Sequence, residues 1–194
     1  MSRFDGRRWE IDRSAESAAL PAIRPRPVQW RYTLDYEPTE RRQLVALDLP
    51  SAAPAGTRLT ADHSLLSDLP LASLTRWTLQ SSPPLAYAAD LGEYQRRQAL
   101  QLPEGFNPRT QALARRWRAE VGNDDAALIE RTLAWIRAEF TYSIDAPLPG
   151  RDTADDFLFE QKIGFCEHYS SAFVILMRNA GIPARVVTGF AGGI

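Results

Sequence analysis

The stretch GFCEHYSSAFVILMRNAGIP, residues 164–183, decides more of the fold than any other part of this 194-residue chain. Its apolar residues recur every three or four positions, the spacing that places side chains on one face of an α-helix. Gly181 and Pro183 are residue types that end helices. We therefore predict an amphipathic helix that begins at or within one residue of Cys166, after a bend at Gly164. Its core-facing residues are predicted to be Tyr169, Ala172, Phe173, Leu176, Met177 and Ala180.

Two further helices are predicted upstream of this stretch. Asn107 followed by Pro108 is typical of an N-cap and a first helical position. Asn123 and Asp124 likewise precede a run with helical periodicity. The apolar stripe of that second run is predicted to be Ile129, Leu133, Ile136 and Phe140.

Two shorter elements complete the second half of the chain. Asp152 or Thr153 is expected to cap a short helix that carries apolar residues at 157–159. The acidic pair Asp155 and Asp156 opens this helix, where carboxylates favour the positive end of the helix dipole. ARVVTGF, residues 184–190, is predicted to be the strand that follows the Cys166 helix.

The first half of the chain has the period of β-strands. VQWRYTLDYE, residues 28–37, alternates apolar and polar side chains strictly, which is typical of a half-buried strand. Shorter strand candidates follow at 44–49, 57–66 and 76–80, and RFDGRRW at 3–9 contains an Asp-Gly turn. These patterns predict a small antiparallel β module over residues 1–88. With a helical domain over residues 89–194, the predicted fold class is α+β.

Composition and charge exclude several classes of protein. The chain is 44% hydrophobic and 24% charged, which predicts a folded, soluble protein with a core. Its net charge of −1 and interspersed charges argue against nucleic acid as a partner. No apolar run approaches the ~18 residues of a membrane span, so we expect no membrane contact by this segment. The start, MSRFDGRRWE, lacks the apolar core of a signal peptide.

Cys166 is the only cysteine, so no internal disulfide can form. At a helix N-terminus, unpaired backbone amides and the helix dipole favour a thiolate and can bind the oxyanion that forms when a thiolate attacks a carbonyl. The alternative interpretation is a small buried hydrophobic residue, the usual state of a free cysteine. Position alone favours this alternative, and the adjacent carboxylate of Glu167 also disfavours a thiolate.

The two histidines are poor candidates for a base that activates Cys166. His168 follows Cys166 by two positions, and such neighbours point to different faces of a helix. We expect it to be structural, bonding a carbonyl of the preceding loop, while His63 belongs to the β-rich half. Cys166 and His168 form a C-x-H pair without the further clustered ligands that a metal ion requires. No metal site and no cofactor is therefore predicted.

The stretch GFCEHYSSAFVILMRNAGIPARVVTGFAGG, residues 164–193, closely resembles the nucleophile region of the bacterial transglutaminase-like family. The nearest likeness is to TgpA-type proteins, in which this domain faces the periplasm from a multi-pass inner-membrane protein. The likeness extends upstream through TADDFLFEQKIGFCEHY and, more loosely, through FTYSIDAPLPG and residues 128–140. It covers the last 70 residues or so well and the β-rich part faintly.

This resemblance implies a papain-like α+β fold in which Cys166 is the nucleophile of a Cys-His-Asp triad. The implied substrate is a peptide or protein. The thiolate attacks an amide carbonyl, and the resulting thioester is released by an amine or by water. The chain would then be a domain of a membrane-anchored protein at the periplasmic face of the inner membrane.

The chain departs from the family at its end. The family's histidine and aspartate lie beyond the strand that ARVVTGF represents, and the sequence ends at Ile194. We therefore expect the front half of an enzyme domain, inactive by itself, with an exposed sheet edge through which it can dimerise.

Two other hypotheses remain open at this point. The chain can be a binding or scaffolding module in which Cys166 is a relic, or its thiol can serve a redox or intermolecular-disulfide role.

Overall fold

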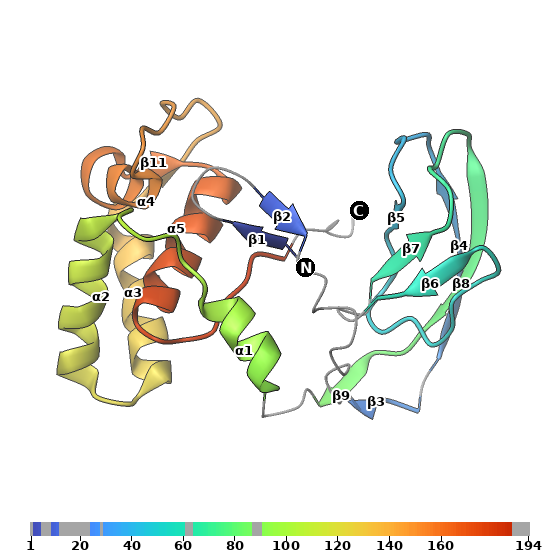
Figure 1. The fold of residues 1–194 in the computed structure, drawn as a ribbon, viewed down its shortest axis with the longest axis horizontal. Coiled ribbons are helices and arrows are strands. Elements are labelled where there is room, and N and C mark those ends of the chain that lie inside the picture. The colour runs from blue at the N-terminus through green and yellow to red at the C-terminus, as the bar shows by residue number, and fades with distance from the viewer. Residues whose placement is uncertain are drawn as a thin grey trace. The chain divides into compact units, whose positions relative to one another are not determined.

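The computed structural model describes residues 2–4, 9–11, 24–27, 29–60, 64–86 and 91–187 (Figure 1). Its contacts divide the chain into two compact units, residues 12–94 and residues 1–11 with 95–194. The predicted domain boundary between residues 88 and 89 lies outside the described residues and stays a prediction.

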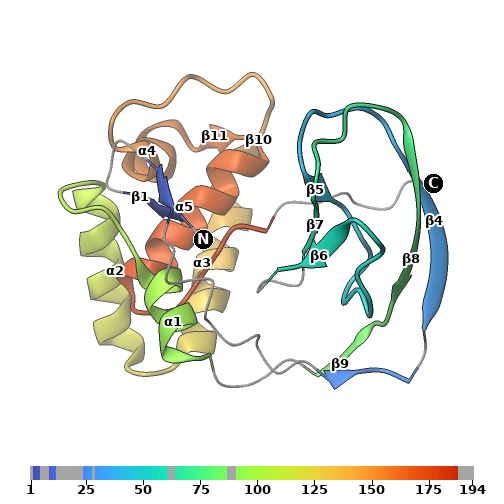
Figure 2. The same ribbon diagram turned by 45° about the vertical axis from the view of Figure 1, so that its right-hand side comes forward.

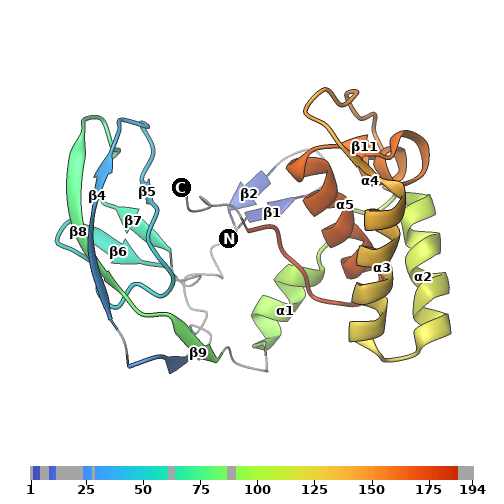
Figure 3. The same ribbon diagram turned by 180° about the vertical axis from the view of Figure 1, so that it is seen from behind.

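The unit of residues 12–94 is built from antiparallel strand pairs, as Figure 3 shows. The long pair is β4 with β8, β7 pairs with both β5 and β6, and β3 pairs with β9. The strands are β3 (Arg24–Pro25), β4 (Trp30–Tyr36), β5 (Gln43–Leu44), β6 (Thr57–Leu59), β7 (Leu65–Ser67), β8 (Thr75–Ser81) and β9 (Pro84–Ala86).

The predicted alternation along residues 28–37 is confirmed from Tyr32 to Tyr36, whereas Trp30, also on the predicted apolar face, is 41% exposed. Tyr32, Leu34 and Tyr36 pack against a core, while the residues between them face outward. That core consists of Leu44, Leu65, Leu71 and Leu79. The candidate at 44–49 is a strand only at its first residue, and the candidate at 57–66 divides into β6 and the start of β7. Val28 lies outside the described residues.

The other unit holds a hairpin, the helices and a short parallel strand pair (Figure 2). The hairpin strands flank the predicted Asp-Gly turn, which itself lies outside the described residues. The elements are β1 (Ser2–Phe4), β2 (Trp9–Ile11), α1 (Glu93–Leu100), α2 (Pro108–Val121), α3 (Asp125–Glu139), β10 (Thr141–Tyr142), α4 (Thr153–Asp155), the π-helix η2 (Asp156–Gln161), β11 (Ile163–Gly164) and α5 (Cys166–Asn179). Helices with antiparallel strand pairs confirm the α+β class.

The core of this unit lies among α2, α3 and α5, which are side by side in Figure 1 and Figure 2. Its buried residues are Leu113, Ala114, Trp117, Leu128, Leu176, Met177, Ala180 and Ile182. The face predicted for α5 is confirmed, because Ala172, Leu176 and Met177 are buried. On α3 the buried residues are Leu128, Thr132 and Ile136. The first two lie one position before the predicted Ile129 and Leu133. Thr132 is accommodated because its hydroxyl donates to the Leu128 carbonyl at 2.8 Å.

The helix α5 ends as predicted, with Gly181 in the left-handed region at φ 80°. The predicted strand at 184–190 is wrong for residues 184–187, which form no ladder, and residues 188–190 lie outside the described part. The amide of Ala184 donates instead to the Ala99 carbonyl at 3.0 Å. Arg178 holds the same segment, because its Nε donates to the Ala184 carbonyl and its Nη1 to that of Gln101, both at 2.8 Å.

Candidate active site

Cys166 is the first residue of α5 and is exposed to solvent. The interpretation of this thiol as a buried core residue is therefore wrong. The chain reaches Cys166 through β11, which pairs in parallel with β10, so that the Ser143 amide donates to the Gly164 carbonyl at 2.8 Å. Phe165 follows in an extended conformation, with φ −120° and ψ −172°, and is the N-cap residue of α5.

Gly164 is required by a close approach of side chains. A Cβ atom at this position would lie 2.7 Å from Cβ of His168 and 2.9 Å from Cε2 of Phe157. Real Cβ atoms do not come so near to other heavy atoms, so any other residue would displace one of these rings. The sequence prediction of a bend at Gly164 missed this reason, since Gly164 lies in β11 and is buried.

His168 faces back toward the residue before Cys166. Its Nδ1 accepts from the Phe165 amide at 3.4 Å, a distance at the long end for a hydrogen bond. The predicted bond to a carbonyl of the preceding loop is not found among the described residues, and His168 accepts from an amide of that loop instead. The ring contacts two aromatic rings, with centroid distances of 4.5 Å to Phe165 and 5.8 Å to Phe157.

The first turn of α5 has no side-chain cap among the residues that the structure describes. Phe165 occupies the N-cap position and has no oxygen or nitrogen in its side chain with which to accept an amide proton. The amides at the start of α5 and the positive end of its dipole therefore remain available to an anion beside the Cys166 thiol. This arrangement suits both a thiolate and the oxyanion of an acyl-transfer reaction.

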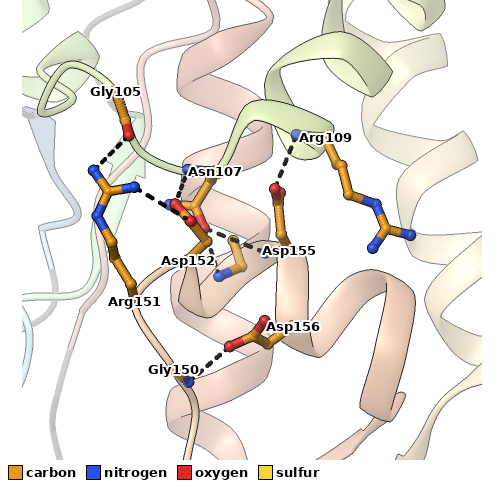
Figure 4. Close-up of polar contacts among 9 residues, drawn as sticks. Gly105, Asn107, Arg109, Gly150, Arg151, Asp152, Asp155 and Asp156 are labelled. Carbon is orange, nitrogen blue, oxygen red and sulfur yellow. Dashed lines mark hydrogen bonds and ion pairs between the residues drawn. The ribbon is translucent and has the colours of Figure 1, made fainter.

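The starts of α2 and α4 cap each other, as Figure 4 shows. The buried carboxylate of Asp155, at the end of α4, accepts from the amides of Arg109 at 2.9 Å and Thr110 at 2.7 Å, and from the Thr110 hydroxyl at 2.6 Å. In return, Asn107 Oδ1 accepts from the amides of Ala154 at 2.8 Å and Asp155 at 3.2 Å. Asn107 is the predicted N-cap of α2, but its side chain caps α4.

Asp155 and Asp156 lie in the first turns of α4 and η2, as predicted, and their carboxylates also bind other segments of the chain. Asp155 caps α2, and Asp156 accepts from the Gly150 amide at 2.7 Å (Figure 4). Asp152 is the N-cap residue of α4, but its carboxylate accepts from the Asn107 amide at 2.7 Å. These three carboxylates hold backbone segments together.

The π-helix η2 connects the hydrogen-bonded residues at 150–156, called here the capped cluster, to β11 and Cys166. Lys162, in the left-handed region at φ 51°, closes η2 by donating its amide to the Phe157 carbonyl at 3.0 Å. Phe157 is buried and packs against His168 and Tyr169 of α5. Lys162 also forms an ion pair with Glu139 at the end of α3. The buried ring of Phe157 thus supports the backbone that leads into Cys166.

Two tyrosines, one on β10 and one on α5, contact each other near the start of α5. Tyr142 of β10 is the register partner of Gly164 and is 62% exposed. Its ring centroid lies 5.9 Å from that of Tyr169, one turn into α5. Burial, followed by the neighbouring Tyr142, raises the pKa of Tyr169. An exposed aromatic ring, that of Tyr142, therefore packs on a part-buried one in the first turns of α5.

The described residues were also searched for a metal site and for a membrane-spanning helix. No group of three histidine, cysteine, aspartate or glutamate side chains comes together there to hold a metal ion. None of the described helices is long and apolar enough to cross a membrane. His63 lies outside the described residues.

Two family models match the chain. The model of the transglutaminase-like superfamily matches residues 111–193, and that of the TgpA N-terminal domain matches residues 1–88. A protein-glutamine gamma-glutamyltransferase of Pseudomonas aeruginosa is 34% identical over 193 residues, which are 100% of this chain and 29% of the relative. The uncharacterized protein YebA of Bacillus subtilis is 38% identical over 99 residues, 48% of this chain and 13% of that protein. The chain thus spans less than a third of the Pseudomonas relative.

The crystal structure of the periplasmic domain of TgpA from Pseudomonas aeruginosa has the same fold. It superposes with a TM-score of 0.85 at 36% identity and covers 99% of this chain and 67% of that domain. The same domain bound to ethylmercury gives the same TM-score and identity over 68% of its length. With a shared fold, substantial identity and both family models, the chain belongs to the transglutaminase-like superfamily and is of the TgpA type.

Proposed function

We propose that Cys166 is the nucleophile of a transglutaminase-like cysteine enzyme that transfers an acyl group from a peptide or protein amide. The observation that carries this proposal is an exposed thiol on the first residue of a helix whose first turn has no described side-chain cap. The name of the Pseudomonas relative supports the side-chain amide of a glutamine residue as the acyl donor.

In the proposed reaction, the Cys166 thiolate attacks the amide carbonyl carbon, and a C–S bond forms. The oxyanion accepts hydrogen bonds from amides at the start of α5. The C–N bond then breaks, ammonia leaves with a proton from the base, and a thioester remains. An amine or water then attacks the thioester carbonyl carbon and gives a proton to the base; a C–N or C–O bond forms, the C–S bond breaks, and the Cys166 thiolate is released.

The base for this reaction is proposed to come from outside this sequence. His168 Nδ1 is directed to the Phe165 amide. The acceptor amine is likewise proposed to come from outside this sequence, because Lys162 is its only lysine and is paired with Glu139. Transfer to an amine and hydrolysis by water remain alternative outcomes of the same thioester.

A periplasmic location is part of the proposal. It is supported by the solved structure, which is described as a periplasmic domain. Attachment to the inner membrane through another part of the protein is proposed with it, from the TgpA-type family.

The proposal is tested by comparing two thiols on the same helix. The rate of alkylation by iodoacetamide at pH 7 is measured for the wild-type chain and for Cys166→Ser/Ser170→Cys, which moves the thiol one turn along α5. We expect Cys166 to react about tenfold faster, because the reference thiol lies away from the amides and dipole of the helix start. p-Nitrophenyl acetate should likewise acetylate Cys166 with a stoichiometric burst of nitrophenolate.

Equal rates for the two thiols, together with no acetyl group on Cys166, would favour a binding or scaffolding module in which the cysteine is a relic. A disulfide-linked dimer band in non-reducing electrophoresis would instead favour the intermolecular-disulfide hypothesis.

A further inference from the structure

We propose that His168 is a positioning residue for Cys166, because its Nδ1 fixes the peptide group of Phe165 from which α5 begins. The inference rests on the proposed function, since it concerns how the nucleophile is held. It assigns His168 no role in moving the thiol proton. The juxtaposition that carries it is His168 between Phe157, Gly164 and the Phe165 amide.

His168 supplies one half of a capping box. In the complete motif, the N-cap side chain accepts from the amide of the third helical residue, and that residue's side chain accepts from the N-cap amide. Here His168 is the third helical residue and accepts from the Phe165 amide at 3.4 Å. Phe165 has no side-chain acceptor with which to return the contact.

The missing half has a chemical consequence. A serine or aspartate at the N-cap would place an oxygen on the first-turn amides, where it would compete with an oxyanion for the same donors. The single hydrogen bond from the Phe165 amide to His168 orders the N-cap peptide and leaves the amides of the first turn unoccupied. It therefore combines a fixed helix start with an open anion site, which an ordinary cap cannot do.

The ring of His168 is held on several sides. Phe165 meets it edge-on, with an interplanar angle of 80°, and Phe157 packs at a centroid distance of 5.8 Å. On the side of Gly164 there is no room for a Cβ atom, which would lie 2.7 Å from His168 Cβ and 2.8 Å from its Cγ. A ring packed this closely has little freedom to turn its Nδ1 away from the amide.

The bond also defines the protonation of the ring. An imidazole nitrogen accepts a hydrogen bond only when it carries no proton, so the contact requires the neutral ring with its hydrogen on Nε2. Histidine provides this acceptor at a fixed distance from Cβ. Asparagine can place its Oδ1 near the position of Nδ1, whereas glutamine places its amide near the position of Nε2.

This difference gives a matched pair of variants, His168→Asn and His168→Gln. Each is compared with the wild type by the iodoacetamide rate of Cys166 and by the melting temperature, with Cys166→Ser/Ser170→Cys as the reference thiol. We expect His168→Gln to lose about tenfold in rate, to the level of the reference thiol, and His168→Asn to keep most of the wild-type rate. The melting temperature should fall by similar amounts in both variants, because both lose the aromatic ring.

Hydrogen exchange provides a readout in the unmodified chain. The Phe165 amide should be protected in the wild type and in His168→Asn, and it should exchange faster in His168→Gln. Nitrogen NMR of the wild type should show an unprotonated Nδ1 on His168. These measurements test the contact even if one variant folds poorly.

The outcomes separate this inference from the proposed function. Equal rates in the two variants, or a wild-type Nδ1 that carries a proton at pH 7, would overturn the positioning role of His168. A wild-type Cys166 no faster than the reference thiol would overturn the proposed function itself. The positioning role would be established if Cys166 reacts with iodoacetamide faster in His168→Asn than in His168→Gln while the two variants have similar melting temperatures.

Discussion

Two helix starts in the same unit are built in opposite ways. At the start of α2, the buried carboxylate of Asp155 accepts from two backbone amides and a hydroxyl. At the start of α5, the N-cap is Phe165, no described side chain caps the first turn, and the adjoining thiol of Cys166 is exposed. One start is fully occupied by protein groups and the other is left open.

The difference separates stability from function. A capped helix start satisfies its amides within the protein and strengthens the fold. An uncapped start leaves its donors to water or to a ligand, and it contributes less to stability. The capped cluster at 150–156 leads directly into η2, whose Phe157 supports the open start. The capped start of α2 and its partner residues thus help to position the uncapped start of α5, where Cys166 lies.

The largest expected effect comes from emptying the capped start. Asp155→Ala removes the acceptor of three hydrogen bonds, and it leaves the part-buried Arg109 amide and the buried amide and hydroxyl of Thr110 without this partner. We expect a loss of about 3 kcal/mol in the free energy of unfolding, measured by urea denaturation and far-UV circular dichroism.

Asp124→Ala is the matched control for this prediction. Asp124 caps α3 in the ordinary way, by accepting from the Ala127 amide at 2.9 Å. Its loss should cost about 1 kcal/mol, since the site is exposed and water can replace the carboxylate. Equal losses in the two variants would contradict the structural role assigned to the buried Asp155.

Local patterns were sufficient to predict several elements. The apolar period of α5, Gly181 after its end and Asp124 before α3 act within a few residues of the elements they define. The helix α1 was not predicted, because none of its residues is buried and it therefore lacks a clear apolar face. The predicted strand at 184–187 failed because Ala184 pairs with Ala99, and that contact is not encoded in the local alternation.

The candidate site was predicted only in part, because some of its features depend on local sequence and others on contacts between distant segments. The position of Cys166 at a helix start follows from the sequence around it, whereas its exposure depends on how distant segments pack. Asp155 caps Thr110 across 45 residues of sequence, and no local pattern indicates such a contact. The role of Gly164 likewise depends on Phe157, which the periodicity of either segment does not place beside it.

A second prediction converts the open start into a closed one. Phe165→Asn and Phe165→Asp each place a capping oxygen over the first turn of α5, and only Asp adds a negative charge. We expect stability to change by less than about 1 kcal/mol, because the new cap offsets the lost contact of Phe165 with His168.

Reactivity should change more than stability in these two variants. The iodoacetamide rate of Cys166 should fall in Phe165→Asn, because the cap occupies the amides, and should fall further in Phe165→Asp, because the carboxylate also repels a thiolate. Rates unchanged from the wild type in both variants would show that the amides of the first turn do not influence the thiol.

The smallest effect is expected at the ion pair between Glu139 and Lys162, next to β11. The hydrogen bond from Lys162 lowers the pKa of Glu139 below its ordinary value of 4.5. Any stability from this pair is present above that ordinary value and is lost as the pH falls through the lowered one. At neutral pH, Glu139→Gln should match the wild type within the error of urea denaturation, because the two side chains are 38% and 45% exposed and such surface ion pairs contribute little.

The same variant tests what supports the open helix start. If Phe157, Gly164 and His168 hold the chain before Cys166, as their contacts indicate, Glu139→Gln should leave the iodoacetamide rate of Cys166 unchanged. Any small difference in stability from the wild type should shrink further in acid as Glu139 becomes protonated. A rate loss in Glu139→Gln as large as that in His168→Gln would place the support at Lys162, and the start of α5 would then depend on a surface charge.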